Sequence, residues 1–311
     1  MSKEKALLFF KGAAMGAADI VPGVSGGTIA FITGIYEELI NSIQSVSLRT
    51  LVTLKEQGFV AAWNSINGTF LLTLFSGILF SVFTLAKLIS YLLVAYPEML
   101  WSFFFGLVLA SVWHVSQQVK VWRLINILPI AVGAVIAWSL GSASFAEVEA
   151  TTVNVFFAGC LAICAMILPG ISGSFILLLL GMYSYILDAV KSLDVAVLAV
   201  FAGGCVVGLL TIANLLAWAF KRFHDYTLLI LTGFMIGALN KVWPWKETIS
   251  SRLNSHGEQV PLLQNNILPG QYEILTGHSA YLGWAIASVV CGIVVVLLLE
   301  QFGRADGRSR H

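Results

Sequence analysis

The sequence predicts an all-α integral membrane protein with inverted-topology repeats, each a re-entrant helical hairpin plus three transmembrane helices. Of its 311 residues, 58% are hydrophobic and only 11% are charged, whereas soluble domains carry about 25% charged residues. Several charge-free stretches are long enough to cross a bilayer, which takes roughly 20 apolar residues. A hydroxyl-bearing Pro-Gly motif also occurs twice, at corresponding places of two hydrophobic halves.

The repeated motif defines the two predicted hairpins. The first copy covers 22–28 (PGVSGGT), and the second follows 147 positions later at 169–175 (PGISGSF). Each copy interrupts an apolar segment, so we expect re-entrant hairpins over 6–46 and 153–190 with the motif at each tip. Such paired interruptions are the best sequence indication of a transporter site. The residues expected to break the helices are Pro22, Gly23, Pro169 and Gly170.

The remaining apolar segments supply three spans per repeat. The expected spans are about 69–94, 99–118 and 124–141 in the first repeat, and 195–220, 226–243 and 280–300 in the second. The repeats would occupy 1–141 and 153–303, joined by an external linker at 142–152, with a cytoplasmic tail at 304–311. Because three is an odd number, the second repeat would be inserted upside down.

The distribution of basic residues predicts the orientation in the membrane. With a cytoplasmic N-terminus, most Lys and Arg residues lie on the cytoplasmic side, and only Lys191, Lys241, Lys246 and Arg252 lie outside. The positive-inside rule favours this arrangement, which also places the C-terminus in the cytoplasm. The long polar segment 244–279 is then external, and we expect a loop or a cap with short helices.

Small and hydroxyl-bearing residues at the two motifs form the predicted anion site. Free N–H groups and the dipole at a helix N-terminus favour an anion, and glycine lets the backbone approach a ligand closely. The alternative is helix capping and tight packing without any ligand. The predicted phosphate-binding residues of the motifs are Ser25, Gly26, Gly27, Thr28, Ser172, Gly173 and Ser174.

Four further polar residues are candidates for the same site. Lys87 lies within an apolar span, where a central charge costs about 2.5–3.5 kcal/mol. It would either face the cavity and neutralise the anion, or snorkel to the interface. Asp19 precedes the first motif and would bind a coupling proton or cation, or pair with Lys87. Glu38 and Asn214 are accessory candidates, although Glu38 also fits a solvated helix end.

No metal, cofactor or nucleic acid is expected from this sequence. The four cysteines all lie in apolar runs, and Cys160 and Cys164 share one helix face. Because no His or carboxylate lies with Cys160 and Cys164 to complete a metal site, we interpret the cysteines as small buried hydrophobic residues. The oligomeric state is left open.

The motifs resemble those of a known family. GAADIVPGVSGGT at 16–28, GIYEEL at 34–39 and PGISGS at 169–174 resemble bacterial polyprenyl-phosphate transporters of the PopT type, long catalogued as a domain of unknown function. The resemblance covers nearly the whole chain. It implies a protein of the bacterial inner membrane that recycles undecaprenyl phosphate from the outer to the cytoplasmic leaflet, for cell-wall and surface-polymer synthesis.

A second resemblance, to undecaprenyl-pyrophosphate phosphatases of the BacA type, suggests a different function. That family has an arginine after the motif serine and a Glu-x-x-Glu pair, whereas here Gly26 and Gly173 take the arginine's place and Glu37 and Glu38 are adjacent. Without that guanidinium, charge on a transferring phosphoryl group has less stabilisation. We therefore expect a shared binding architecture without the chemistry. The sequence is also compatible with a small-anion transporter and with an assembly factor.

An anion moving inward opposes the membrane potential, at about 2.3 kcal/mol per charge per 100 mV. We therefore expect a transporter of undecaprenyl phosphate that is coupled to protons or sodium, with membrane lipids as its other partners.

Overall fold

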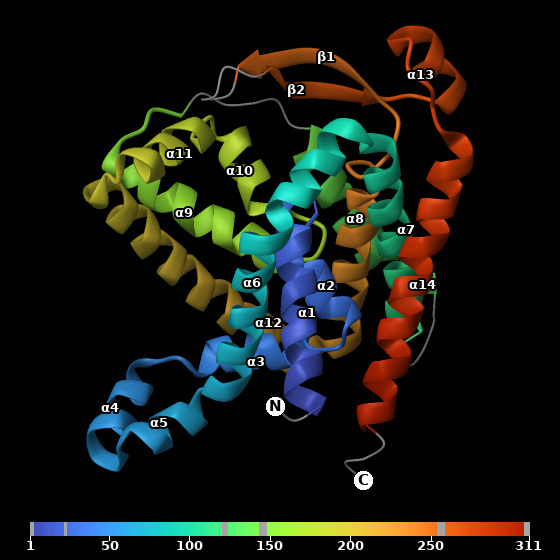
Figure 1. Ribbon diagram of the computed structural model, residues 1–311. Coiled ribbons are helices and arrows are strands. Elements are labelled where there is room, and N and C mark those ends of the chain that lie inside the picture. The colour runs from blue at the N-terminus through green and yellow to red at the C-terminus, as the bar shows by residue number, and fades with distance from the viewer. Residues whose placement is uncertain are drawn as a thin grey trace.

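The computed structural model describes residues 3–21, 24–117, 119, 124–142, 148–253 and 259–307. Two of the predicted helix breaks, Pro22 and Gly23, lie outside these ranges. So do residues 143–147 of the predicted linker and 308–311 of the predicted tail. Within the described ranges the chain is mostly helical, with one pair of strands (Figure 1).

The element bounds are as follows. The first half contains α1 (Lys3–Ile20), α2 (Gly26–Ile32), α3 (Tyr36–Ser45), α4 (Leu48–Gln57), α5 (Phe59–Ser65), α6 (Gly68–Ala95), α7 (Pro97–Ser116), a 3-10 turn (Leu124–Asn126) and α8 (Ile127–Ser142). The second half contains α9 (Thr152–Ile167), α10 (Gly173–Leu179), α11 (Tyr183–Ser192), α12 (Val195–Ala238), β1 (Lys246–Leu253), β2 (Gln259–Asn266), α13 (Pro269–Thr276) and α14 (Leu282–Gly307).

Three helices, α6, α7 and α12, are long and apolar enough to cross a membrane, and α8, α9 and α14 contain shorter apolar stretches. The 44 residues of α12 would measure about 66 Å if straight, twice the thickness of a bilayer core. Phe223 interrupts α12 with non-helical angles (φ −138°, ψ 48°). The spans expected over 195–220 and 226–243 correspond to the two arms on either side of this kink (Figure 1).

Glycines bring the long helices into backbone contact. A Cβ atom on Gly12 of α1 would overlap the carbonyl of Leu74 on α6, and one on Gly159 of α9 would overlap that of Phe201 on α12. Small residues allow such close approach between helices in membranes. The same kind of contact holds α7 to α14 and α8 to the second arm of α12, at Gly106, Gly292, Gly133 and Gly233.

The two motif regions have matching element bounds. A shift of 147 positions carries α2 onto α10 and α3 onto α11, residue for residue. A glycine ends the short helix in both copies, Gly34 with φ +71° and Gly181 with φ +70°, a conformation that L side chains avoid. The chain then turns sharply, by 112° between α10 and α11.

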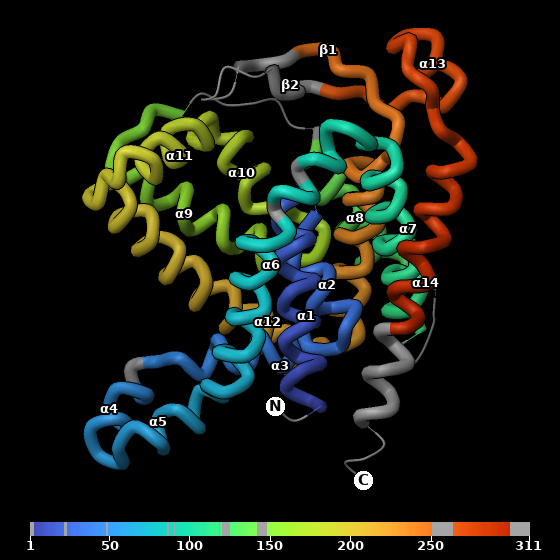
Figure 2. Tube along the Cα trace, in the orientation of Figure 1, coloured from blue at the N-terminus to red at the C-terminus, as the bar shows by residue number. Residues whose placement is uncertain are grey.

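The copies lie toward opposite ends of the molecule. In Figure 1, α3 lies toward the end that holds the N-terminus, and α11 lies toward the end that holds β1 and β2. Figure 2 shows α4 and α5 extending away from the helical body at the first of these ends, and α13 beside the strands at the other.

The polar segment 244–279 differs from the sequence expectation. It contains the antiparallel pair β1–β2 followed by α13, so the all-α prediction misses two strands. Neither β1 (KETISSRL) nor β2 (QVPLLQNN) shows a strict alternation of apolar and polar residues, so this pattern does not indicate strands here. Their register shifts twice. The hairpin is tied to the helices, because the indole N–H groups of Trp243 and Trp245 donate to the carbonyls of Ile267 and Ala280, both at 2.9 Å.

Gly204→Ala is expected to destabilise the protein, because its Cβ would overlap the carbonyl of Phe156 on α9. Overpacking of this kind costs about 1–3 kcal/mol. Gly203→Ala is the matched control, since the nearest atom to its Cβ would be a Phe156 ring carbon at 3.9 Å. Thermal unfolding in detergent should show a lower Tm for the first variant alone. Equal Tm values would contradict the close α9–α12 packing.

Candidate functional site

The two helix breaks meet inside the protein. The Ser25 hydroxyl donates to the Met166 carbonyl at 2.8 Å, with a longer contact of 3.5 Å to the Leu168 carbonyl. In the opposite direction, the Gly170 N–H donates to the Thr28 hydroxyl oxygen at 2.9 Å. Ser25 and Thr28 are each only 1% exposed. The structure therefore brings the first motif and the second break into direct polar contact.

These bonds supply hydrogen-bond donors to the carbonyl groups at the end of α9. The last carbonyls of a helix have no partner within it, and an unpaired buried carbonyl is costly, by about 1–3 kcal/mol. Ser25 satisfies one of them, and the phenol of Tyr36 donates to the next, at Ile167, over 3.1 Å. Tyr36 is 2% exposed and its ring packs edge-on against Phe31 and Phe220. The first half of the chain thus caps a helix of the second half.

An internal carboxylate occupies the start of α2. The Gly26 N–H donates to Asp19 Oδ1 at 2.6 Å, and the Gly27 N–H donates to the Ser25 hydroxyl at 3.1 Å. A Cβ on Gly26 would lie 2.5 Å from Asp19 Oδ2, and one on Gly27 would lie 2.5 Å from the Ile167 carbonyl oxygen. Both glycines are therefore required by close approach, and Asp19 lies where the sequence analysis expects an anion.

The start of α10 has no matching carboxylate, because Met166 holds the position that corresponds to Asp19. The hydroxyls of Ser172 and Ser174 bond to each other at 2.9 Å, and Ser172 makes no side-chain cap. Gly173 packs against the carbonyl of Ala162 on α9. The two motifs are alike in sequence and backbone but differ in their polar partners.

Lys87 and Asn214 lie apart from this contact. Both side chains are exposed, on α6 and α12 respectively, and the Asn214 amide donates to the Leu210 carbonyl of its own helix at 2.8 Å. Among the described residues, no hydrogen bond joins either side chain to a motif. The exposed position of Lys87 fits both interpretations of this residue, a cavity open to lipid and the membrane interface, and its role in binding stays a prediction.

Glu38 lines two cavities, of about 210 and 410 Å³, near the first hairpin. Its carboxylate accepts a bond from the Asn67 amide at 3.1 Å, and Asn67 lines both cavities too. The smaller cavity also contacts Lys11, which is 9% exposed and donates to the Thr33 carbonyl at the end of α2, over 2.9 Å. The smaller cavity therefore places charged groups of both signs beside the far end of α2.

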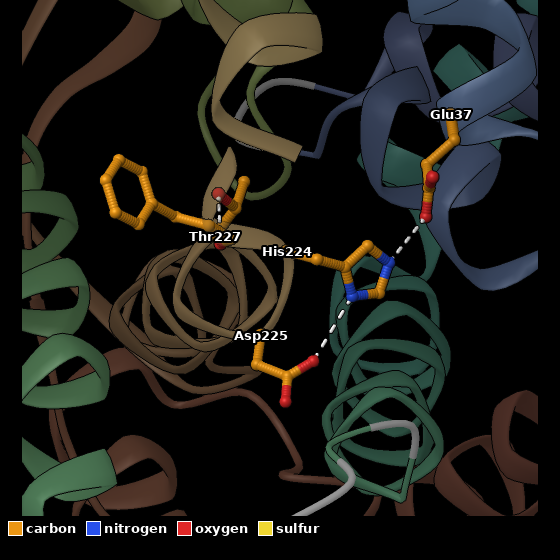
Figure 3. Close-up of polar contacts among 5 residues, drawn as sticks. Glu37, His224, Asp225 and Thr227 are labelled. Carbon is orange, nitrogen blue, oxygen red and sulfur yellow. Dashed lines mark hydrogen bonds and ion pairs between the residues drawn. The ribbon is translucent and has the colours of Figure 1, made fainter. Parts of the chain in front are cut away.

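His224 makes polar contacts with Glu37 and Asp225 that the sequence analysis does not predict. It follows the α12 kink, and Figure 3 shows its ring between Glu37 of α3 and Asp225. Its Nε2 lies 3.2 Å from Glu37 Oε1, and its Nδ1 lies 3.3 Å from Asp225 Oδ1. Glu37 is 187 positions away, so no local pattern could indicate the pairing. The sequence does mark Tyr36 as part of the repeat, because Tyr183 occupies the matching position in the second copy.

Comparison with known proteins identifies the family. A family model described as undecaprenyl phosphate translocase-like matches residues 15–260, a range that includes both helix breaks. This chain belongs to that family. A relative from Vibrio cholerae serotype O1 named polyprenyl-phosphate transporter is 51% identical over 294 residues, which cover 94% of this chain and 96% of the relative.

A second relative of the family, from Staphylococcus aureus, has the same name and is 30% identical over 263 residues, which cover 78% of this chain and 88% of the relative. No solved structure matches the chain. Because the curated relatives are named transporters, the family assignment identifies a membrane transporter and not an enzyme.

Tyr36→Phe is expected to lower the free energy of unfolding by about 1–3 kcal/mol, because it leaves the Ile167 carbonyl without its partner. Tyr226→Phe is the control, since Tyr226 is 50% exposed. Denaturant unfolding in detergent should separate the two variants. If Tyr36→Phe unfolds like the control, the phenol does not cap α9.

Proposed function

We propose that this protein transports undecaprenyl phosphate from the outer to the cytoplasmic leaflet of the bacterial inner membrane, and so recycles the carrier lipid for cell-wall and surface-polymer synthesis. The observation that carries the proposal is the contact between the two helix breaks. It forms one polar site, shared by both halves, inside an otherwise apolar fold. The names of the relatives and of the family support the choice of lipid.

The halves are proposed to be inverted repeats, each a re-entrant hairpin with three spans. The equal bounds of α2 and α10 and of α3 and α11 support this arrangement, as does the placement of α3 and α11 toward opposite ends (Figure 1). Inverted repeats can exchange conformations and so open one shared site alternately to each side. Both termini would then be cytoplasmic.

The phosphate is proposed to bind where the tips now hold each other. A phosphate offers only acceptors to the protein, and the site offers the Ser25 hydroxyl and the Gly170 N–H as donors once their present bonds are broken. Each present bond contributes about 0.5–1.5 kcal/mol, whereas bonds to a charged group contribute about 1.5–3 kcal/mol. Bonds to the charged head group can therefore offset the loss of these two bonds, provided that water reaches the Met166 carbonyl that Ser25 leaves.

The other predicted site residues have distinct places in this proposal. Thr28, Ser172 and Ser174 supply further hydroxyls, and Gly26, Gly27 and Gly173 keep the approach open. Lys87 would contact the phosphate at the lipid-facing rim, since its side chain is exposed on the apolar helix α6. The prenyl chain would remain in lipid while the head group crosses.

Asp19 is the proposed coupling residue. Its carboxylate holds the Gly26 N–H at 2.6 Å, so an arriving phosphate meets a like charge beside the binding site. A proton or sodium ion on Asp19 removes that repulsion. It also offsets part of the cost of moving an anion inward, about 2.3 kcal/mol per charge per 100 mV. Glu38 and Asn214 are proposed as accessory polar residues.

Purified protein in liposomes should move undecaprenyl phosphate between leaflets, measured by its accessibility from outside. Thr28→Val should slow the movement about tenfold or more, because a bond to a charged group is lost, while Thr28→Ser should retain most of it. Wild-type liposomes without movement would refute the transporter. Release of inorganic phosphate from undecaprenyl pyrophosphate would support a phosphatase instead.

Asp19→Asn should remove the dependence of transport on an imposed proton or sodium gradient, because the amide carries no titratable charge and cannot replace a carboxylate as a cation ligand. Transport rates with and without each gradient, in wild-type and Asp19→Asn liposomes, give the comparison. If the variant responds to a gradient as the wild type does, Asp19 is not the coupling residue.

A further inference from the structure

Two lysines meet at the end of the molecule that holds the β-hairpin. Lys241 follows the end of α12, and Lys246 begins β1. The Lys246 ammonium donates to the Lys241 carbonyl at 2.6 Å and lies 3.8 Å from the centre of the Trp101 ring. The Lys241 ammonium lies 4.6 Å from the centre of the Phe175 ring. Both cations therefore rest on aromatic faces, an attractive arrangement.

This lysine pair is joined to the second motif. Phe175 directly follows Ser174 near the start of α10, so the Lys241 ammonium lies over the helix that the motif opens. The aliphatic part of Lys241 packs on α8, where a Cβ on Gly141 would be 2.9 Å from Lys241 Cε. Trp101 lies on α7. The pair thus bridges helices of both halves, on the side of the protein that the charge pattern predicts to be external.

Within the part of the chain that the structure describes, the two positive charges lack a counter-charge, since no carboxylate oxygen lies within 4.0 Å of either ammonium. Two carboxylates of neighbouring elements have other partners: Glu98 accepts from the Tyr272 phenol, and Glu273 accepts from the Ala280 N–H at 2.9 Å. Burial, together with the charge on Lys241, lowers the pKa of Lys246 to about 7.

Uncompensated cations at this place are unfavourable unless an anion joins them. Desolvation and a like charge both destabilise an ammonium, and the positive-inside rule gives no reason for lysines on the external side. The bond to the Lys241 carbonyl, beyond the end of α12, accounts for one donor of Lys246 and for none of Lys241. An ammonium has three donors, so both lysines retain donors for a ligand.

We propose that Lys241 and Lys246 form the receiving site for a phosphomonoester head group that arrives from the outer leaflet, with Trp101 and Phe175 beside the first isoprene units. This assignment rests on the proposed transport of a polyprenyl phosphate. The bound dianion would raise the pKa of Lys246 again and would then match two ammonium groups in charge. Phe175, under the Lys241 ammonium, lies next to Ser174 and close to Ser172 at the start of α10. The head group would therefore bind the lysine pair first and then move to the helix breaks.

The test compares Lys241→Gln, Lys246→Gln and the double variant with wild type, as full-length protein in liposomes. Lys191→Gln is the matched control, because Lys191 is an exposed lysine on the same predicted side. The initial transport rate is measured against the amount of undecaprenyl phosphate in the outer leaflet. We expect the apparent KM to rise about tenfold or more in the double variant, with kcat nearly unchanged, and Lys241→Arg to restore most of the affinity.

The outcomes separate this proposal from the transporter proposal. If the wild type transports and the double variant has an unchanged KM, the receiving site is refuted and the transporter stands. If no variant transports but a short-chain prenyl phosphate still binds the wild type better than the double variant, the receiving site stands and the transporter fails. A further measurement uses inorganic phosphate as a competitor, to test whether the lysines bind a free ion. If inorganic phosphate inhibits transport at the concentrations at which the lipid saturates it, the assignment to a lipid head group is overturned. A lower Tm without a change in KM would show a purely structural role.

Discussion

The capping of α9 by the first motif is the interaction on which the rest of the structure depends. A helix that ends inside a membrane protein leaves carbonyl groups that neither lipid nor its own turns can satisfy. Ser25 and Tyr36 satisfy these groups from the other half of the chain, and Thr28 accepts the N–H of Gly170 in return. Because the bonds join different halves, the two breaks cannot separate without exposing polar backbone. A phosphate could replace the acceptors of the Ser25 hydroxyl and the Gly170 N–H, whereas the Met166 and Ile167 carbonyls would then need a donor such as water.

The two halves have the same helix packing but differ in the placement of their charged groups. Close glycine contacts hold α1 to α6 and α9 to α12 in the same manner, so the packing is duplicated. The carboxylate of Asp19 at the start of α2 has no counterpart, since Met166 lies at the matching position. The site is therefore less favourable for an anion beside α2 than beside α10. The lysine pair near the β-hairpin adds a second asymmetry, because it favours an anion at that end of the molecule.

Polar groups are confined to a few places along the molecule. Glu38, Asn67 and Lys11 surround the cavities near the first hairpin, the motifs meet in the middle, and Lys241 and Lys246 lie near the β-hairpin. His224 connects α3 to the kink of α12, which places a polar contact where the two arms of the longest helix change direction. Between these places the described helices are largely apolar, and their backbone groups are satisfied within each helix. A charged head group therefore has few points at which it can be stabilised.

The sequence by itself predicted a mostly helical, apolar membrane protein and the correspondence of α2 and α3 with α10 and α11, because hydropathy and a repeated motif are local properties. That the two halves are inverted repeats stays a prediction, and so does the assignment of binding roles to the residues at the tips. Only the tertiary structure decided that Ser25 pairs with Met166, that Asp19 occupies the start of α2, that Lys87 is exposed and that Lys246 meets Lys241. It also revealed the polar β-hairpin, whose strands carry no clear period. The Ser25–Met166 contact depends on how helices more than a hundred residues apart pack at their glycines. The Asp19–Gly26 and Lys246–Lys241 contacts join residues that are close in the sequence, but they depend on the turns between them, and a linear pattern of residue types contains no record of that geometry.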